Sequence, residues 1–197
     1  MKLILASASP RRAEILRNAG FEFEVLPAHV DETRFPGESP EDCVRRLADA
    51  KAHNAAEKQT RSHTRAIIIG ADTAVVVAGE LLGKPIDIED ARRMLRLLSG
   101  QTHEVLTGVS VLRVPEGASA LHVETTRVTF LKLTEKDIDD YIDTGEPFDK
   151  AGGYGIQGIG GRYIPRIEGC YFNVMGLPLS KVASLIRTFE SERTAGA

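Results

Sequence analysis

The feature that most constrains the fold is an apolar run from Ala66 to Ala78, rich in isoleucine and valine. Such a run is typical of a strand that is buried on both faces of a sheet. Asp72 and Thr73 interrupt it. Because an ionised carboxylate is costly to bury without a partner, Asp72 is predicted to lie at a functional site. The alternative is that Asp72 caps a turn at a break in the strand.

Strand and helix patterns alternate along the rest of the chain. A hairpin-like pairing through Pro115-Glu116-Gly117 adds an antiparallel element, so the predicted class is α/β with a mixed sheet. The length of 197 residues favours a single domain over residues 1–197. Strands are expected over residues 2–6, 21–26, 66–78, 102–114 and 120–133, and helices over 10–19, 40–59, 88–99, 135–143 and 178–190.

Composition narrows the class of ligand. The 25 Lys and Arg residues nearly balance the 28 Asp and Glu residues, which excludes a general binder of nucleic-acid polymers. The apolar stretch at the N-terminus is too short for a signal peptide, and the run around Asp72 is too polar to span a membrane. Cys43 and Cys170 lack the spacing of a zinc site or a disulfide scaffold. A cytoplasmic protein with a small ligand is expected.

Positively charged side chains occur at three positions where the local sequence disfavours them or leaves their role open. Arg11 and Arg12 follow Ser7-Ala8-Ser9-Pro10 in the first turn of a predicted helix, where the helix dipole disfavours positive charge. They are either solvated surface residues or, as we favour, ligands of an anion such as phosphate. Lys51 falls on the apolar stripe of its own helix, and Lys84 lies in a tight segment between Gly83 and Pro85. Each either extends to solvent or reaches into a cleft.

Two further segments bear on the ligand. Asp31-Glu32 lies in a loop, where most carboxylates are solvated, but together with Asp72 it has the oxygen ligands that a divalent cation prefers. His103 follows a helix end, and a lone histidine there is more often structural. Residues 153–158 match GxGxxG but do not open a βαβ unit, so a dinucleotide site is rejected. Gln157 within them has an amide that donates and accepts, as the edge of a nucleobase requires.

Taken together, these segments resemble the Maf family of nucleoside triphosphate pyrophosphatases. The matching pieces keep their order over nearly the whole chain, and jointly they are highly specific. They are Ser7-Ala8-Ser9-Pro10-Arg11-Arg12, Asp31-Glu32, Arg46-Leu47-Ala48 with Lys51-Ala52, Gly70-Ala71-Asp72-Thr73, Gly83-Lys84-Pro85, Leu98-Ser99-Gly100-Gln101-Thr102-His103, residues 149–158, and Val174-Met175-Gly176-Leu177-Pro178.

The resemblance implies an elongated mixed sheet flanked by helices, with two lobes around a central cleft, as in inosine triphosphate pyrophosphatase-like folds. It also implies hydrolysis of a nucleoside triphosphate to the monophosphate and pyrophosphate with a divalent cation, Mg²⁺ or Mn²⁺, and suggests a homodimer. The Tyr-Gly-Ile-Gln stretch is similar to that of the branch that prefers dTTP and UTP, so the expected substrates are dTTP, UTP or their modified pyrimidine analogues. Two alternatives stay open: another canonical or methylated nucleotide as substrate, and a low-turnover nucleotide-binding regulator of cell division.

The resemblance assigns roles to individual residues. Asp72 is the expected proton acceptor, and Glu32 with Asp72 is the expected metal site. The expected contacts to substrate, with the first three residues setting base specificity, come from Arg11, Thr73, Gln157, Ser7, Arg12, Lys51 and Lys84.

Overall fold

The chain, described by a computed structural model over residues 1–60 and 65–191, forms two compact units. The described part of the first unit comprises residues 1–60, 65–72, 107–124 and 176–191, and the second comprises 73–106 and 125–175. Three long strands contribute residues to both units: β3 (Ala66–Val77), β5 (Thr102–Val114) and β6 (Ser119–Thr129).

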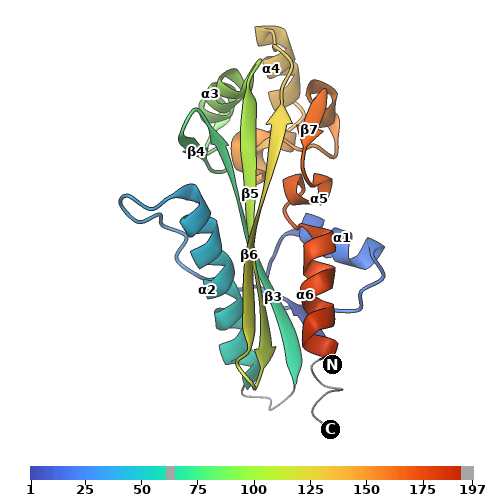
Figure 1. Cartoon of the computed structure of the whole chain (residues 1–197). Coiled ribbons are helices and arrows are strands. Elements are labelled where there is room, and N and C mark those ends of the chain that lie inside the picture. The colour runs from blue at the N-terminus through green and yellow to red at the C-terminus, as the bar shows by residue number, and fades with distance from the viewer. Residues whose placement is uncertain (61–64, 192–197) are drawn as a thin grey trace. The chain divides into compact units, whose positions relative to one another are not determined.

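Each unit also has elements of its own (Figure 1). The first unit holds β1 (Lys2–Leu5), α1 (Pro10–Asn18), β2 (Glu24–Val25), α2 (Pro40–Thr60) and α6 (Leu179–Ser191). The second holds β4 (Glu80–Leu82), α3 (Ile88–Leu98), α4 (Glu135–Ile142), β7 (Arg166–Glu168), α5 (Tyr171–Val174) and the short 3₁₀ helices η1 (Glu146–Asp149), η2 (Ala151–Gly153) and η3 (Ile159–Tyr163).

The strands form one seven-stranded sheet in the order β2-β1-β3-β5-β6-β7, with β4 paired to β3. β1 pairs in parallel with both β2 and β3, whereas β4 and β7 pair antiparallel with β3 and β6. Parallel and antiparallel pairs in one sheet with helices confirm the mixed α/β class expected from the sequence. No helix in the described ranges combines the length and the apolar character needed to cross a membrane.

In the first unit, α2 lies along one side of the strands, and α1 and α6 lie along the other (Figure 1). Small side chains allow α2 to approach closely: Ala48, Ala52 and Ala55 are fully buried. At Gly70 of β3, a Cβ atom would lie only 2.2 Å from the Ala48 carbonyl oxygen. A Cβ atom at Gly108 of β5 would come equally close to the backbone of α2. The sheet therefore needs glycine at these two positions to seat the helix.

This contact yields a stability prediction for Gly70→Ala. The added methyl group must push the backbone of α2 away from β3, and we expect a loss of about 2 kcal/mol in the free energy of unfolding, as for other overpacked cores. Urea denaturation measures it. Gly83→Ala is the matched control, because a Cβ atom there would meet nothing within 4 Å. Equal stability of the two variants would contradict the close approach.

The second unit is built around a core between α3, α4 and the strands. Met94, Leu95 and Leu98 of α3 pack in one buried cluster with Ile138 and Tyr141 of α4. Both helices begin at side-chain caps that the sequence predicts. The Asp87 side chain accepts a hydrogen bond from the Asp90 N–H group, and Thr134 forms a reciprocal capping box with Asp137.

Some boundaries differ from the sequence prediction. The strand expected over residues 21–26 is only β2 (Glu24–Val25), an exposed edge strand. The strand expected to reach residue 133 ends at Thr129, because the next residues leave the ladder: the Leu131 N–H group donates to the Tyr163 carbonyl, and the Leu133 N–H group donates to Ser99 Oγ. β7 and α5 are too short to show a periodic pattern, and the sequence did not predict them.

Candidate active site

One lysine joins two carboxylates in the first unit. The Lys51 Nζ atom lies 2.6 Å from Asp72 Oδ1 and 2.6 Å from Glu32 Oε1. The side chains of Lys51 and Asp72 are only 10% and 16% exposed, whereas that of Glu32 is 62% exposed. The buried charge that the sequence places in an apolar strand is therefore paired, as burial requires. Glu32 keeps one side of the group open to solvent.

Lys51 reaches Asp72 because α2 packs closely on β3. Gly70 and Asp72 are two residues apart, and Ala48 and Lys51 are one helical turn apart. The contact of Ala48 with Gly70 therefore brings Lys51 beside Asp72. The apolar stripe on which the sequence placed Lys51 is the face of α2 that packs on the sheet.

Arg12 holds three chain segments of the first unit together. Its Nε donates a hydrogen bond of 2.8 Å to the Gly176 carbonyl oxygen. Its Nη1 donates to Ser7 Oγ at 3.0 Å and to the Ala71 carbonyl oxygen at 2.9 Å. These contacts tie the segment after β1 and the segment before α6 to Ala71, the residue that precedes Asp72. The sequence predicted a phosphate ligand here, but much of the hydrogen-bonding capacity of Arg12 serves protein oxygens.

The charges around Arg12 lie close enough to influence its ionisation. Burial lowers the pKa of Arg12; the negative charges of Asp72 and Glu32 oppose this shift, and the positive charge of Arg11 adds to it. An arginine stays protonated in proteins, so the guanidinium remains a buried cation. Opposite charges thus meet in the first unit. The cations lie at the start of α1, and the carboxylates are Glu32 in its loop and Asp72 in β3.

The N-terminus of α1 has the features of an anion site. Ser9 is the N-cap, and its Oγ accepts a hydrogen bond from the Arg12 N–H group at 3.5 Å, while Pro10 occupies the first turn. The first turn carries no acidic residue. Half-buried Arg11 adds a cation to the positive end of the helix dipole. The sequence predicted this cap and this start of the helix.

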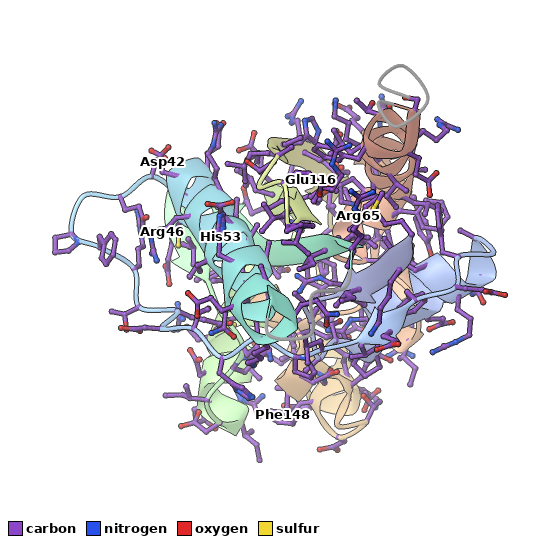
Figure 2. The ribbon with its side chains drawn as sticks, turned by 90° about the horizontal axis from the view of Figure 1, so that it is seen from below. Asp42, Arg46, His53, Arg65, Glu116 and Phe148 are labelled. Carbon is purple, nitrogen blue, oxygen red and sulfur yellow. The ribbon has the colours of Figure 1, made fainter. Side chains whose placement is uncertain are left out.

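The loop that carries Glu32 is anchored to α2 by Arg46, whose position on that helix is shown in Figure 2. The Arg46 guanidinium binds both carboxylate oxygens of Glu38, at 2.6 and 2.8 Å. It also donates to the Thr33 carbonyl oxygen at 3.1 Å and stacks 4.0 Å from the centre of the Phe35 ring. Its hydrogen bonds lower the pKa of Glu38 to about 2. Sequence reasoning assigned no role to Arg46, because its partners lie in an irregular loop.

Thr73, Lys84 and Gln157 belong to the second unit, so the approach of Lys84 and Gln157 to Asp72 stays a prediction. Thr73 is half-buried and directly follows Asp72 in β3, and Lys84 and Gln157 are exposed. Within the second unit, the segment of Lys84 is hydrogen-bonded to the start of the glycine-rich segment, five residues before Gln157. The Gly152 N–H group donates to the Gly83 carbonyl oxygen at 2.9 Å.

The first glycines of residues 152–161 permit close packing within the second unit. Gly152 and Gly153 adopt positive φ angles of 73° and 69°. Cβ atoms there would lie 3.0 Å from the Val75 side chain and 3.2 Å from Pro85. These residues form short 3₁₀ turns rather than the strand–turn–helix of a dinucleotide fingerprint, in agreement with the rejection of GxGxxG.

His103 is a structural residue in the core of the second unit, as the sequence suggested. It is 2% exposed, and its ring packs against Phe130 and Tyr154. The His103 Nε2 atom lies 2.7 Å from the Tyr154 hydroxyl oxygen. Within the described residues the buried Nδ1 atom has no hydrogen-bond partner. Burial lowers the pKa of His103 to about 4, so the ring is neutral at physiological pH.

The lowered pKa of His103 predicts a pH dependence of stability. Between the usual histidine pKa of about 6.5 and the folded value of about 4, the unfolded chain binds a proton that the folded chain excludes. Lowering the pH through this range therefore costs stability, by roughly 2 kcal/mol between about pH 7 and about pH 5. His103→Gln should remove this part of the slope. Urea denaturation of both proteins at the two pH values measures it, and parallel slopes would contradict it.

The first-unit group has the donors for a hard divalent cation. The Glu32 and Asp72 oxygens lie at the same distance from one Lys51 nitrogen, so they are at most twice that distance apart. Mg²⁺ and Mn²⁺ prefer oxygen ligands, and Mg²⁺ is commonly held by one or two carboxylates together with substrate phosphates. In the described ranges no three His, Cys, Asp or Glu residues gather around a common point. Two carboxylates suit a metal ion whose other ligands come from a bound phosphate.

Fold and site together define an α/β protein with a buried carboxylate–lysine pair beside a cationic helix N-terminus. A family model described as Maf-like protein matches residues 2–189. The chain belongs to the Maf family.

Close relatives cover almost the whole chain. It is 50% identical over 187 residues to a dTTP/UTP pyrophosphatase of Koribacter versatilis, covering 95% of this chain and 94% of the relative. It is 51% identical over 191 residues to one of Anaeromyxobacter dehalogenans, covering 94% and 93%. A third relative with the same description, from Geobacillus sp., is 50% identical over 186 residues, covering 94% and 97%.

One solved structure is a distant match. It is described as a nucleoside-triphosphatase / dITP/XTP pyrophosphatase from Mycobacterium abscessus, is 13% identical, and covers 98% of this chain and 97% of its own. Its TM-score is 0.40.

Proposed function

We propose that the protein hydrolyses dTTP and UTP to the monophosphate and pyrophosphate. The observation that carries the proposal is the group of Glu32, Lys51 and Asp72, with two carboxylates on one ammonium. Membership of the Maf family and the description shared by the full-length relatives support the substrate class. We further propose that one Maf-like domain accounts for the chain, since the family model spans residues 2–189.

Asp72 is the proposed general base. A water molecule attacks at the α–β phosphoanhydride of the nucleotide, the bridging P–O bond breaks, and pyrophosphate leaves. The Asp72 carboxylate accepts the proton that the water loses, and the reaction consumes one water for each nucleotide cleaved. Lys51 holds Asp72 Oδ1 at 2.6 Å and thereby fixes the orientation of the carboxylate.

The cations of the site oppose the charge of the triphosphate. Arg11, Lys51 and Lys84 are the proposed phosphate contacts, with the N–H groups at the start of α1. Arg12 and Ser7 are proposed to add to these contacts, and they are joined to each other, since Arg12 Nη1 donates to Ser7 Oγ. This arrangement binds the leaving pyrophosphate more strongly as its charge develops.

Glu32 and Asp72 are the proposed holders of a divalent cation. When bound, Mg²⁺ or Mn²⁺ neutralises charge on the phosphate oxygens. Lys51 binds one oxygen of each carboxylate, Glu32 Oε1 and Asp72 Oδ1, so the proposed metal ligands are their second oxygens.

The proposed specificity residues are Arg11, Thr73 and Gln157. The Gln157 amide is able to pair with the N3–H group and a carbonyl of thymine or uracil. Because rotation of the amide also suits cytosine, backbone groups of the surrounding loop must add to the choice of base.

Pyrophosphate release from a panel of purified nucleoside triphosphates tests the proposal, with Mg²⁺ or Mn²⁺ present. We expect dTTP and UTP to be cleaved with the highest kcat/KM. Release mainly from another canonical or methylated nucleotide would reassign the substrate. Binding without release from any nucleotide would instead support a regulator of cell division. The homodimer suggested by the resemblance stays a prediction.

A further inference from the structure

Gln157 is exposed, so its direction depends on the backbone of the loop that carries it. The fully buried Tyr141 ties one end of this loop: its hydroxyl oxygen accepts a hydrogen bond of 3.1 Å from the Gly155 N–H group. The half-buried Glu146 ties the other end. Its Oε2 accepts from the Ile159 N–H group at 2.9 Å.

The two anchors are joined to each other. Glu146 Oε1 accepts a hydrogen bond of 2.8 Å from the Tyr141 hydroxyl and one of 3.2 Å from the Gly160 N–H group. One carboxylate thus receives three donors and links both ends of the loop. All of these residues belong to the second unit, so the arrangement is complete within it.

The loop backbone lies directly against this carboxylate. Gly158, next to Gln157, has a φ of 135°, which other residues rarely adopt. A Cβ atom there would lie 2.7 Å from Glu146 Oε2, and one at Gly160 would lie 2.6 Å from the Tyr141 hydroxyl oxygen. The glycines on this side of the loop are therefore needed for contact with Glu146 and Tyr141.

Glu146 accepts from three donors, and an ionised carboxylate, which only accepts, suits this role best. Burial alone would raise its pKa, but hydrogen bonds from Ile159, Tyr141 and Gly160, together with the charge of Lys150, lower the pKa below its usual value. The carboxylate therefore stays charged at neutral pH. An amide in its place would direct an NH₂ group at a donor and lose at least one of the bonds.

We propose that Glu146, through Tyr141 and the 155–160 loop, is a positioning residue that aims Gln157 at the nucleobase and so sets base selectivity. The inference rests on the proposed function, because it assigns a task to Gln157 in nucleotide binding. The link between residues 141–146 and Gln157 is visible only in the folded unit.

The test compares kcat/KM for dTTP with that for dATP and dCTP in Glu146→Gln. We expect the preference for dTTP to fall roughly tenfold, the size of a coupling of about 1.4 kcal/mol between neighbouring groups, with a smaller change in kcat. Tyr141→Phe should lower the preference in the same direction. It loses only a hydroxyl, so it serves if Glu146→Gln does not fold. Glu135→Gln, at an exposed carboxylate of the same unit that pairs with Arg96, is the control with unchanged selectivity.

Repeating the substitution in a Gln157→Ala variant separates a positioning effect on Gln157 from a general loss of order in the loop. In Gln157→Ala, the further change Glu146→Gln should leave selectivity unaltered, because the residue through which Glu146 acts is gone. An equal fall in both backgrounds would overturn the inference, as would unchanged selectivity of Glu146→Gln in an active enzyme. No turnover of any nucleotide by the wild-type protein would overturn the proposed function and the inference with it.

Discussion

Asp72→Asn is expected to reduce kcat for dTTP by about 100- to 10,000-fold, the range for loss of a general base. Asparagine has nearly the same shape and keeps an oxygen for the Lys51 ammonium, which lies 2.6 Å from Asp72 Oδ1. Glu32 remains as the second partner of that ammonium, at 2.6 Å. The fold should therefore survive while the proton acceptor is lost. Steady-state kinetics and urea denaturation of the same preparation measure the two effects.

The control for this variant is Asp49→Asn in the same unit. Asp49 lies on α2 and accepts a hydrogen bond of 2.9 Å from the Ser110 hydroxyl. The same chemical change there should leave kcat within about twofold, since Asp49 has no proposed part in catalysis. Near-normal turnover by Asp72→Asn would show that another group accepts the proton.

Arg12→Met should lower the free energy of unfolding by about 4 kcal/mol. The change leaves the Gly176 and Ala71 carbonyl oxygens and Ser7 Oγ without their Arg12 donors, and each such buried group costs about 1–3 kcal/mol. It also removes a buried cation from beside Asp72. This effect is larger than that of an ordinary surface substitution, because three segments of the first unit meet at one guanidinium. Urea denaturation measures it.

Arg17→Met is the matched control, because Arg17 is exposed on the same helix α1. Its effect on stability should stay below about 1 kcal/mol. If Arg12 served only as a phosphate ligand, Arg12→Met would raise KM and leave the free energy of unfolding unchanged, and that outcome would refute the structural role. Arg11→Met is expected to show this pattern of raised KM with unchanged stability.

The regular elements were predictable because their patterns are local. The apolar run that became β3, the Ser9 cap of α1 and the Asp87 and Thr134 caps of α3 and α4 each depend on neighbours a few residues away. The ends of the edge strand β2 were not predictable, and the short β7 was not predicted at all. Their limits are set by the partner strand and not by their own residues.

The candidate site was predictable as a list of residues but not as an arrangement. Asp72 was conspicuous as a carboxylate in an apolar strand, and Lys51 as a cation on an apolar stripe. That Lys51 lies beside Asp72 follows from the contact of α2 with Gly70, to which no local pattern points. Its second bond, to Glu32, depends on the path of an irregular loop. Arg46 and Glu146 were missed as anchors of loops because charged residues in such places are usually solvated.

The sequence by itself determined the α/β class and the main helices and strands. It also showed which charged residues occur where their neighbours disfavour a charge, as Asp72 does in an apolar strand. Burial cost and helix capping act over short stretches of chain, and they leave a visible mark in the order of residues. Only the tertiary structure decided that Arg12 turns inward to bind Ser7, Ala71 and Gly176, and that Glu146 holds the loop of Gln157. Those contacts join residues distant along the chain, and their hydrogen bonds exist only once packing has brought the segments together.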